Sequence, residues 1–340
     1  MMTRINRYLP YFFVISAIVS CKPDARSILP KISGSTGEVL LIIDNQKWES
    51  AVGAKFNEVL TRIQPALPQP EPVLDLIHTS PAGFTNIFRV HRNILFAKIG
   101  SEFEEPKITV QTDQWATPQL IINIQAPNDD ECIRLLEESG DQIIERVNRS
   151  ERGRLMGYYR SYQVAAIYNR LKEKHHLTLS IPKGYEIAMD TTDFVWISTE
   201  SAQPGQSGYA FYSQQSILIY YYDYVDTNTF TIDYLVDKRN KYLKKNIPGP
   251  NPGSYMATED LLPPTMQEFK VDDRYVAELR GLWKLEKGAM GGPFVSLSTV
   301  DEERNRVITV EGFVFAAGMD KREFLRQVES ILYTLEIEKE

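Results

Sequence analysis

The chain has 340 residues, of which 43% are hydrophobic and 11% aromatic, and its formal net charge is −7 at pH 7. A chain of this length and composition can bury a sizeable core and is predicted to form two domains or one closely joined double unit. The acidic balance argues against nucleic acid as a partner and against anionic lipid headgroups as the main contact, because both attract clustered Lys and Arg.

The first 21 residues have the pattern of a bacterial lipoprotein signal peptide. Arg4 and Arg7 precede an apolar run over residues 11–19, which is too short to span about 30 Å of hydrocarbon. The tetrapeptide IVSC resembles a lipobox, so we expect cleavage of residues 1–20 and lipidation of Cys21. An uncleaved anchor with an incidental cysteine is the alternative. The prediction is a protein attached to the membrane by acyl chains, in the outer membrane and facing the periplasm.

The cleaved chain contains two cysteines. Removing residues 1–20 takes away two arginines and no acids, so the net charge moves from −7 to −9. If Cys21 carries lipid, no intramolecular disulfide is possible. Cys132 follows three acidic residues at a predicted helix start, and we expect it to be a packing residue and not a reactive thiol.

The first half of the mature chain reads as a tether followed by mixed helices and strands. Residues 21–36 are predicted to be the tether, and the aliphatic run at 38–44 is predicted to be a buried strand. Apolar residues then recur every three or four positions, which predicts a helix, before four prolines give an extended connector. The remaining predictions are strands at 73–78 and 93–99, a hairpin over 107–111 and 119–125, a helix from Asn128, and a second helical stretch to about 174 after a break at Gly153 and Gly157.

The second half is richer in strand patterns. The segment 216–224 is apolar or aromatic on both faces, which predicts a central strand. The other predicted elements are strands at 177–181, 185–189, 193–199 and 275–284, a helix at 230–245, a hairpin over 293–299 and 306–316, and a final helix from Asp320.

Segments 37–148 and 215–337 show the same predicted order, β-α-β-β-β-α. Chance similarity between common α/β patterns is the alternative. We therefore expect an α+β fold of two similar units, with mostly antiparallel sheets and helices packed on one face of each. The expected domains are 37–175, which includes a trailing helix, and 176–340, with a groove between the repeats.

No sequence motif selects a catalytic residue, a metal site or a cofactor. There is no HExxH, no His/Cys/Asp cluster with metal-ligand spacing and no GxSxG elbow. The glycine run before Pro293 lacks the Lys and Ser/Thr of a phosphate loop. The candidate binding residues come from equivalent regions of the two repeats, where packing and capping are the alternative roles: His91, Arg92, Asn93, Trp283, Gly291 and Gly292.

Several segments together resemble a bacterial lipoprotein family known as domain of unknown function 4837. They are GEVLLIIDNQKWESAVG, LPQPEPVLDLIH, HRNIL at 91–95, GLWK at 281–284 and MGGPFVSLS at 290–298, and the resemblance covers nearly the whole mature chain. It implies a cell-envelope lipoprotein of Gram-negative bacteria, without catalytic residues to transfer. The second half also resembles, at the level of fold alone, the sandwich of photosystem-subunit and Mog1-like proteins.

Three hypotheses for function follow. The first is a non-enzymatic protein that binds or scaffolds an envelope protein or glycan. The second is a glycan or peptide hydrolase that uses carboxylates in the groove between the repeats. The third is a carrier of a small apolar ligand held between the sheets.

Overall fold

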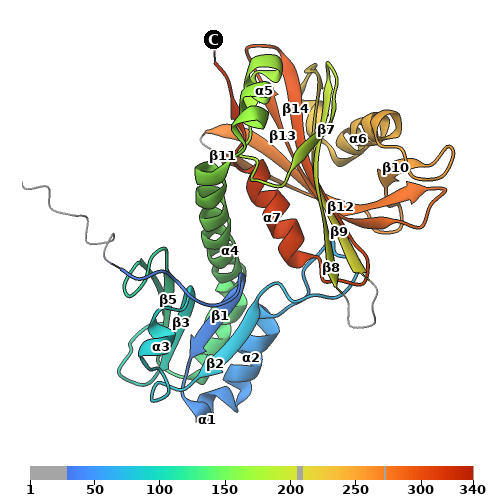
Figure 1. Cartoon of the computed structure of the whole chain (residues 1–340). Helices are drawn as coiled ribbons and strands as arrows, with labels where there is room; N and C mark the ends of the chain where they lie inside the picture. Colours follow the sequence, from blue (N-terminus) through green and yellow to red (C-terminus); the bar gives the residue numbers. More distant parts are fainter. Residues whose placement is uncertain (1–28, 205–209, 272, 340) are drawn as a thin grey trace, which may run out of the picture.

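The computed structural model describes residues 29–204, 210–271 and 273–339. The predicted signal peptide and Cys21 lie outside the described residues. Figure 1 shows two units, each with its own sheet, and the long helix α4 (Asp129–Tyr162) running between them. The predicted α+β class is confirmed, and most strand pairs are antiparallel.

A five-stranded sheet forms the first unit. Its strands, in spatial order, are β2 (Asp75–Thr79), β1 (Glu38–Ile42), β3 (Asn93–Ile99), β5 (Leu120–Ala126) and β4 (Lys107–Thr112). The first four are parallel, and β4 pairs antiparallel with β5, which confirms the predicted hairpin. The parallel pairing of β1 and β2 follows from the helical crossover between them, α1 (Asn45–Trp48) and α2 (Ala51–Leu60). A short helix, α3 (Asn86–Arg89), precedes β3.

The core of this unit lies between its sheet and the helices α2 and α4. Val39 and Leu41 of β1 are packed with Phe56 of α2 and Leu136 of α4. Cys132 lies in the same core, and its burial raises the thiol pKa to about 12. A buried, protonated thiol is a packing residue, as the sequence predicted.

Part of the predicted tether is attached to the first unit. The carbonyl of Pro30 accepts a hydrogen bond from the backbone N–H of Thr117 at 2.9 Å. Ser33 donates its backbone N–H to Val90 and accepts from the backbone N–H of Arg92. The chain is therefore held on this unit from residue 30 onward.

The predicted helix break at Gly153 and Gly157 is wrong, because α4 continues through both glycines for 34 residues. Glycine in a helix interior costs about 1 kcal/mol relative to alanine. α4 also packs against α2 of the first unit and α7 (Arg322–Leu332) of the second, and these tertiary contacts hold the helix together.

An eight-stranded antiparallel sheet forms the second unit. Its main path is β10 (Tyr255–Thr258), β12 (Arg274–Glu286), β13 (Gly291–Asp301), β14 (Arg306–Ala316), β9 (Ala210–Asp223), β8 (Phe194–Pro204) and β7 (Glu186–Asp190), and β11 (Thr265–Val271) also pairs with β12. A small separate ladder joins β6 (Leu177–Thr178) to β15 (Glu336–Ile337).

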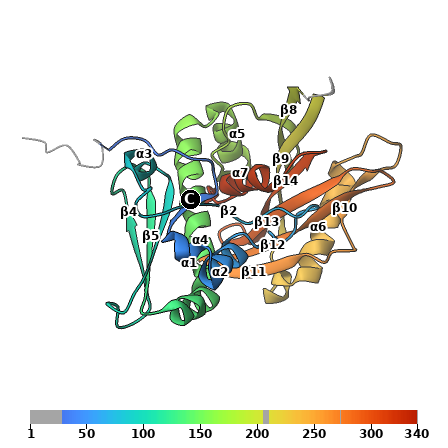
Figure 2. The ribbon, with the colours of Figure 1, turned by 90° about the horizontal axis from the view of Figure 1, so that it is seen from below.

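Helices cover both faces of this sheet, so the expectation of helices on one face is wrong here. Ile217 and Ile219 of β9 pack in a core with α5 (Ala165–His175) and α7. Leu218 and Tyr220 pack in a second core with α6 (Ile232–Asn246), which follows the short η2 (Thr227–Phe230). Figure 2 shows α7 and α6 on opposite sides of the sheet. The physical reason is that the central strand is apolar on both faces.

The two units share a strand–helix–strands–helix outline but differ in strand pairing. Four strands, β2 to β5, lie between the helices of the first unit and five, β10 to β14, in the second, whereas the predicted order has three in each. The order β-α-strands-α occurs as β1 to α4 and again as β9 to α7. β1 pairs in parallel with both of its neighbours, whereas β9 pairs antiparallel with both of its own. Similar sequence patterns therefore form sheets of different connectivity.

Within the described residues, no helix is both long and apolar enough to cross a membrane. In the same part of the chain, no group of three or more His, Cys, Asp or Glu side chains is placed to hold a metal ion.

Candidate functional site

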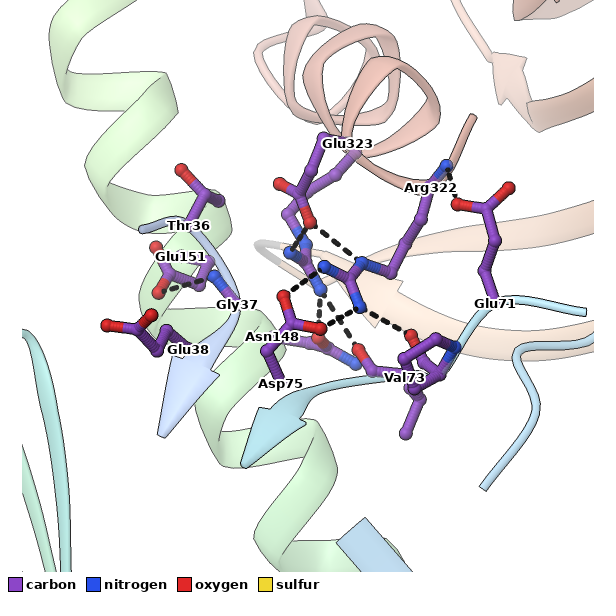
Figure 3. A network of polar contacts seen from close by, with 12 residues as sticks. Thr36, Gly37, Glu38, Glu71, Val73, Asp75, Asn148, Glu151, Arg322 and Glu323 are labelled. Atoms are coloured by element: carbon purple, nitrogen blue, oxygen red, sulfur yellow. Dashed lines mark hydrogen bonds and ion pairs between the residues drawn. The ribbon is translucent and has the colours of Figure 1, made fainter. Parts of the chain in front are cut away.

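The N-terminus of α7 receives its cap from the other unit. The carboxylate of Glu71, in the connector before β2, accepts hydrogen bonds from the backbone N–H groups of Lys321 and Arg322, both at 2.8 Å. The first N–H groups of a helix have no intrahelical partner and carry a partial positive charge, so a carboxylate stabilises them. Glu71 is 4% exposed. A side chain of the first unit thus completes a helix of the second (Figure 3).

Two arginines of α7 extend this contact into the first unit. Arg322 donates to both carboxylate oxygens of Asp75, at 3.1 and 2.5 Å, in the bidentate geometry that makes such pairs strong. Arg326 lies one turn later and donates to the side chain of Asn148 on α4 and to the carbonyl of Val73. Figure 3 shows these groups converging from α7, α4 and the start of β2.

A third ion-paired group lies farther along α7. The carboxylate of Glu329 accepts from Arg152 of α4 at 2.8 Å and from Arg280 of β12 at 3.0 Å. Burial alone raises the pKa of Glu329, but the two guanidinium groups outweigh burial and lower the pKa to about 2. Arg152 also lies over the ring of Tyr333, 3.9 Å from its centroid. We call the following set the junction network: Glu71, Asp75, Arg322 and Arg326, together with Glu329 and its two partners, Arg152 and Arg280.

The predicted residues His91, Arg92 and Asn93 lie beside the junction network, and the structure brings all three together. Arg92 and Asn93 donate to Glu151 of α4, at 2.6 and 2.7 Å. His91 bonds through Nε2 to Glu38 at 2.7 Å and through Nδ1 to the carbonyl of Asn93. His91 and Asn93 are buried. Their hydrogen bonds therefore join β1, β3 and α4 inside the first unit.

Glu151 is the centre of this group and is completely buried. Burial raises its pKa, but the charges of Arg154 and Arg92 and the hydrogen bonds from Asn93 and the Gly37 backbone outweigh burial, and the net shift is downward. A carboxylate held by two cations and two neutral donors remains ionised at neutral pH.

The predicted residues Trp283, Gly291 and Gly292 lie in the second sheet. The indole N–H of Trp283 donates to the carbonyl of Val314 at 3.1 Å, and the ring is 3% exposed. A Cβ at Gly292 would lie 2.1 Å from that same carbonyl oxygen, so the backbones of β13 and β14 require glycine there. At Gly291 a Cβ would lie 2.8 Å from the carbonyl oxygen of Trp283.

The two groups of predicted residues are not brought together. Among the described residues, no hydrogen bond or ion pair links residues 91–93 with Trp283, Gly291 or Gly292. Each group forms its hydrogen bonds within its own unit, and a role of these six residues in binding remains a prediction.

A buried acid–base group escaped the sequence analysis. His175 is fully buried and bonds through Nε2 to Asp190 at 2.8 Å and through Nδ1 to the hydroxyl of Tyr221 at 3.0 Å. Burial lowers the pKa of His175 although Asp190 opposes this, so the imidazole is neutral at pH 7. Burial raises the pKa of Asp190, but hydrogen bonds from Lys174, Arg170 and His175 lower it to about 2. The group joins α5 to β7 and β9.

The sequence of α7 contains a spacing of charged residues that indicates part of the junction network. Arg322, Arg326 and Glu329 follow one another at intervals of four and three, so they share one side of the helix. Leu325, Val328 and Leu332 recur at helical spacing on the other side, which predicts that this side faces the sheet. A charged stripe normally faces water, and only the tertiary structure shows that this one is buried against α4.

The comparisons with known proteins give families without an assigned activity. The model of the family described as Domain of unknown function (DUF4837) matches residues 165–334, which is half of the chain, and that of Domain of unknown function (DUF8532) matches residues 33–160. GLWK and MGGPFVSLS fall within the first match, whereas the quoted N-terminal segments fall within the second. The expectation that the resemblance to the DUF4837 family covers nearly the whole mature chain is therefore wrong. No curated protein matches the chain.

Among solved structures, the Ran-binding protein Mog1p of Saccharomyces cerevisiae has a TM-score of 0.30 and 10% identity, covering 48% of this chain and 90% of that chain. A mutant of protein Mog1 has the same TM-score and coverage with 11% identity. A structure from Bacteroides thetaiotaomicron has a TM-score of 0.20 and 12% identity, covering 48% of this chain and 46% of that chain. Likenesses this low carry no argument. The match over residues 165–334 does, and it shows that the chain belongs to the DUF4837 family.

Proposed function

We propose that the chain is a lipid-anchored, non-enzymatic binding protein of the bacterial cell envelope whose two units act as one rigid body. The observation that carries the proposal is the junction network, in which ion pairs of the buried residues Arg322 and Glu329 join α7 of the second unit to β2 and α4 of the first. A protein that presents a surface in a preset geometry loses less conformational entropy when a partner binds. Rigidity between units therefore suits a binding or scaffolding role.

The path of the described N-terminal segment supports an orientation at the membrane. Residues 30–33 are bonded to the first unit, and position 29 is eight residues after position 21. Eight extended residues span at most about 28 Å. Acyl chains on Cys21 would therefore hold the first unit close to the bilayer. Ser33 is bonded to Arg92, and Arg92 contacts Glu151, the neighbour of the junction residue Arg152 on α4, so the anchor would attach beside the junction between the two units.

The hydrolase hypothesis is weaker because the carboxylates at the junction and beside it, Glu329 and Glu151, have the wrong pKa for a general acid. A glycosidase needs one carboxyl group with a raised pKa to act as general acid. Glu151 and Glu329 both have lowered pKa values and are held by arginines. The carrier hypothesis is weaker because self-packed side chains cover both faces of the second sheet.

The anchor is tested by intact-mass spectrometry of the protein purified from its native cells. We expect a chain that begins at Cys21 and carries acyl groups, and a Cys21→Ser variant that is released from the membrane fraction. A chain that still begins at Met1 with a free thiol would contradict the anchor.

Rigidity is tested by pulsed electron spin resonance between labels at Asn57→Cys on α2 and Lys241→Cys on α6, both exposed positions. Cys132 is buried with a pKa of about 12 and does not compete for the label. We expect a single narrow distance distribution that broadens in Arg322→Ala. A broad distribution in the parent chain would contradict the proposal.

Binding is tested by isolating the protein from solubilised envelopes with its neighbours crosslinked. We expect a complex of defined stoichiometry. A protein that stays solitary and turns over glycan or peptide would support the hydrolase hypothesis instead.

A further inference from the structure

A small polar pocket lies where α4 ends and α5 begins, outside the junction network. Its volume is about 120 Å³, and it is lined by Arg160, Gln163, Tyr168, Thr178, Ser180 and Glu336 together with Thr334. Liquid water occupies about 30 Å³ per molecule, so the space corresponds to about four waters or one very small organic molecule. The pocket is about half open to solvent, so this space limits only the part of a ligand that is held inside it.

The pocket is built from parts of the chain that are distant in sequence. Arg160 is in the last turn of α4, and Thr178 of β6 pairs directly with Glu336 of β15. Residues directly opposite in a ladder place their side chains on the same face. The hydroxyl of Thr334 donates to the carbonyl of Ile331 and accepts the backbone N–H of Ser180 at 2.9 Å, which holds the wall of the pocket in place.

Two hydroxyls in the wall form no hydrogen bond with a described residue. Thr178 is 1% and Ser180 is 5% exposed, but neither side-chain oxygen is among the buried atoms that lack a partner, so both oxygens reach the solvent of the pocket. Facing an open pocket, they are available to a ligand.

The pocket also carries one cation and one anion that are not used elsewhere. In the described part of the chain, Arg160 and Glu336 form no ion pair, either with each other or with another residue. A guanidinium binds a carboxylate through two parallel N–H donors, and a carboxylate accepts from an ammonium group. Opposite charges that share one small space without neutralising each other match a ligand that carries both.

We propose that this pocket binds the zwitterion of a small α-amino acid of the size of glycine or alanine. Arg160 binds the ligand carboxylate, Glu336 accepts from its ammonium group, and the hydroxyls of Thr178 and Ser180 complete the hydrogen bonds. This site goes beyond the proposed scaffolding role and does not depend on lipidation of Cys21. Since α4 belongs to the first unit and β6 and β15 to the second, a bound ligand would contact both.

The test is isothermal titration of the full mature chain, with Cys21→Ser to keep it soluble, using glycine, L-alanine, acetate and methylamine as separate probes. We expect glycine or L-alanine to bind at least tenfold more tightly than acetate or methylamine. Arg160→Gln and Glu336→Gln should each weaken that binding at least tenfold without changing the melting temperature, because both side chains are exposed and unpaired.

Arg149→Gln and Glu186→Gln serve as controls, since both change an exposed charge outside the pocket. Acetate binding as tightly as L-alanine, with Glu336→Gln without effect, would overturn the assignment to a zwitterion. No binding by any of the four probes would overturn the site.

Discussion

Replacing Glu71 by alanine tests whether the cap of α7 really comes from the other unit. The substitution removes an ionised acceptor of two buried backbone N–H groups, those of Lys321 and Arg322. An unsatisfied buried donor costs about 1–3 kcal/mol, and loss of a helix N-cap typically costs about 1 kcal/mol. Because the two donors are neighbours on one helix end, we expect a loss of about 2–4 kcal/mol in the free energy of unfolding. Glu71→Gln keeps one carbonyl acceptor and should cost about half as much.

The assay combines urea unfolding with hydrogen exchange, in a soluble chain that carries Cys21→Ser. We expect the unfolding free energy to fall by the stated amount. Exchange should quicken at the first turn of α7 and at the backbone N–H groups of Val73 and Asp75, beside the acceptors of Arg322. Faster exchange on both sides of the junction would show that the cap couples the units.

The control is Glu105→Ala, which removes an exposed acid from a loop of the first unit. Surface substitutions of this kind usually change stability by less than about 0.5 kcal/mol. If Glu71→Ala behaves like Glu105→Ala, and exchange at Lys321 and Arg322 is unchanged, then the capping argument is wrong.

Four further predictions concern a buried acid, two glycines and a buried ion pair. The pKa of Glu329 is lowered from 4.5 to about 2, which corresponds to a contribution of about 3 kcal/mol to the free energy of unfolding. This contribution is complete above about pH 5 and is lost as the pH falls toward 2. In urea unfolding, Glu329→Gln should therefore show a weaker pH dependence of stability in that range. Gly292→Ala would place a Cβ 2.1 Å from a backbone oxygen and should destabilise the protein by more than about 3 kcal/mol in thermal unfolding. Gly153→Ala, which meets nothing within 4 Å, should instead stabilise α4 by up to about 1 kcal/mol, and the opposite ranking would refute the packing argument. The Arg239–Glu311 pair is completely buried and bidentate. Arg239→Met alone should lower the free energy of unfolding by about 3–5 kcal/mol, because it leaves a buried carboxylate without its partner. Adding Glu311→Leu should recover much of that loss, which a double-mutant cycle measures.

The junction network also explains how a polar interface can hold two units together. An interface between domains within one chain is commonly polar and allows relative motion. Here the charges of Arg322 and Glu329 are buried and paired, so separating the units would expose them only by breaking several hydrogen bonds at once. Arg152 of α4 forms an ion pair with Glu329 of α7 and also lies over the ring of Tyr333, which directly follows α7. This is why one rigid body is the expected behaviour.

Much of the local structure could be predicted because it depends on short-range periodicity. The strand at 93–99, the hairpin of β4 and β5 and the cap at Asn128 all follow from patterns within a few residues. The break predicted at Gly153 failed because propensity was outweighed by packing against α2 and α7. His91, Arg92 and Asn93 were predicted as binding candidates, but the partner of Arg92 and Asn93, Glu151, almost 60 positions away, was not predicted.

By itself the sequence determined the class of the fold, the position of most helices and strands and the lipoprotein pattern that ends at Cys21. Only the tertiary structure decided which residues meet across long separations. Glu71 caps a helix 250 residues later, and Arg160, Thr178 and Glu336 come from separate elements to line one pocket. The physical reason is that helices and strands are encoded by neighbouring residues, whereas a buried charge acquires its partner only when distant elements pack together.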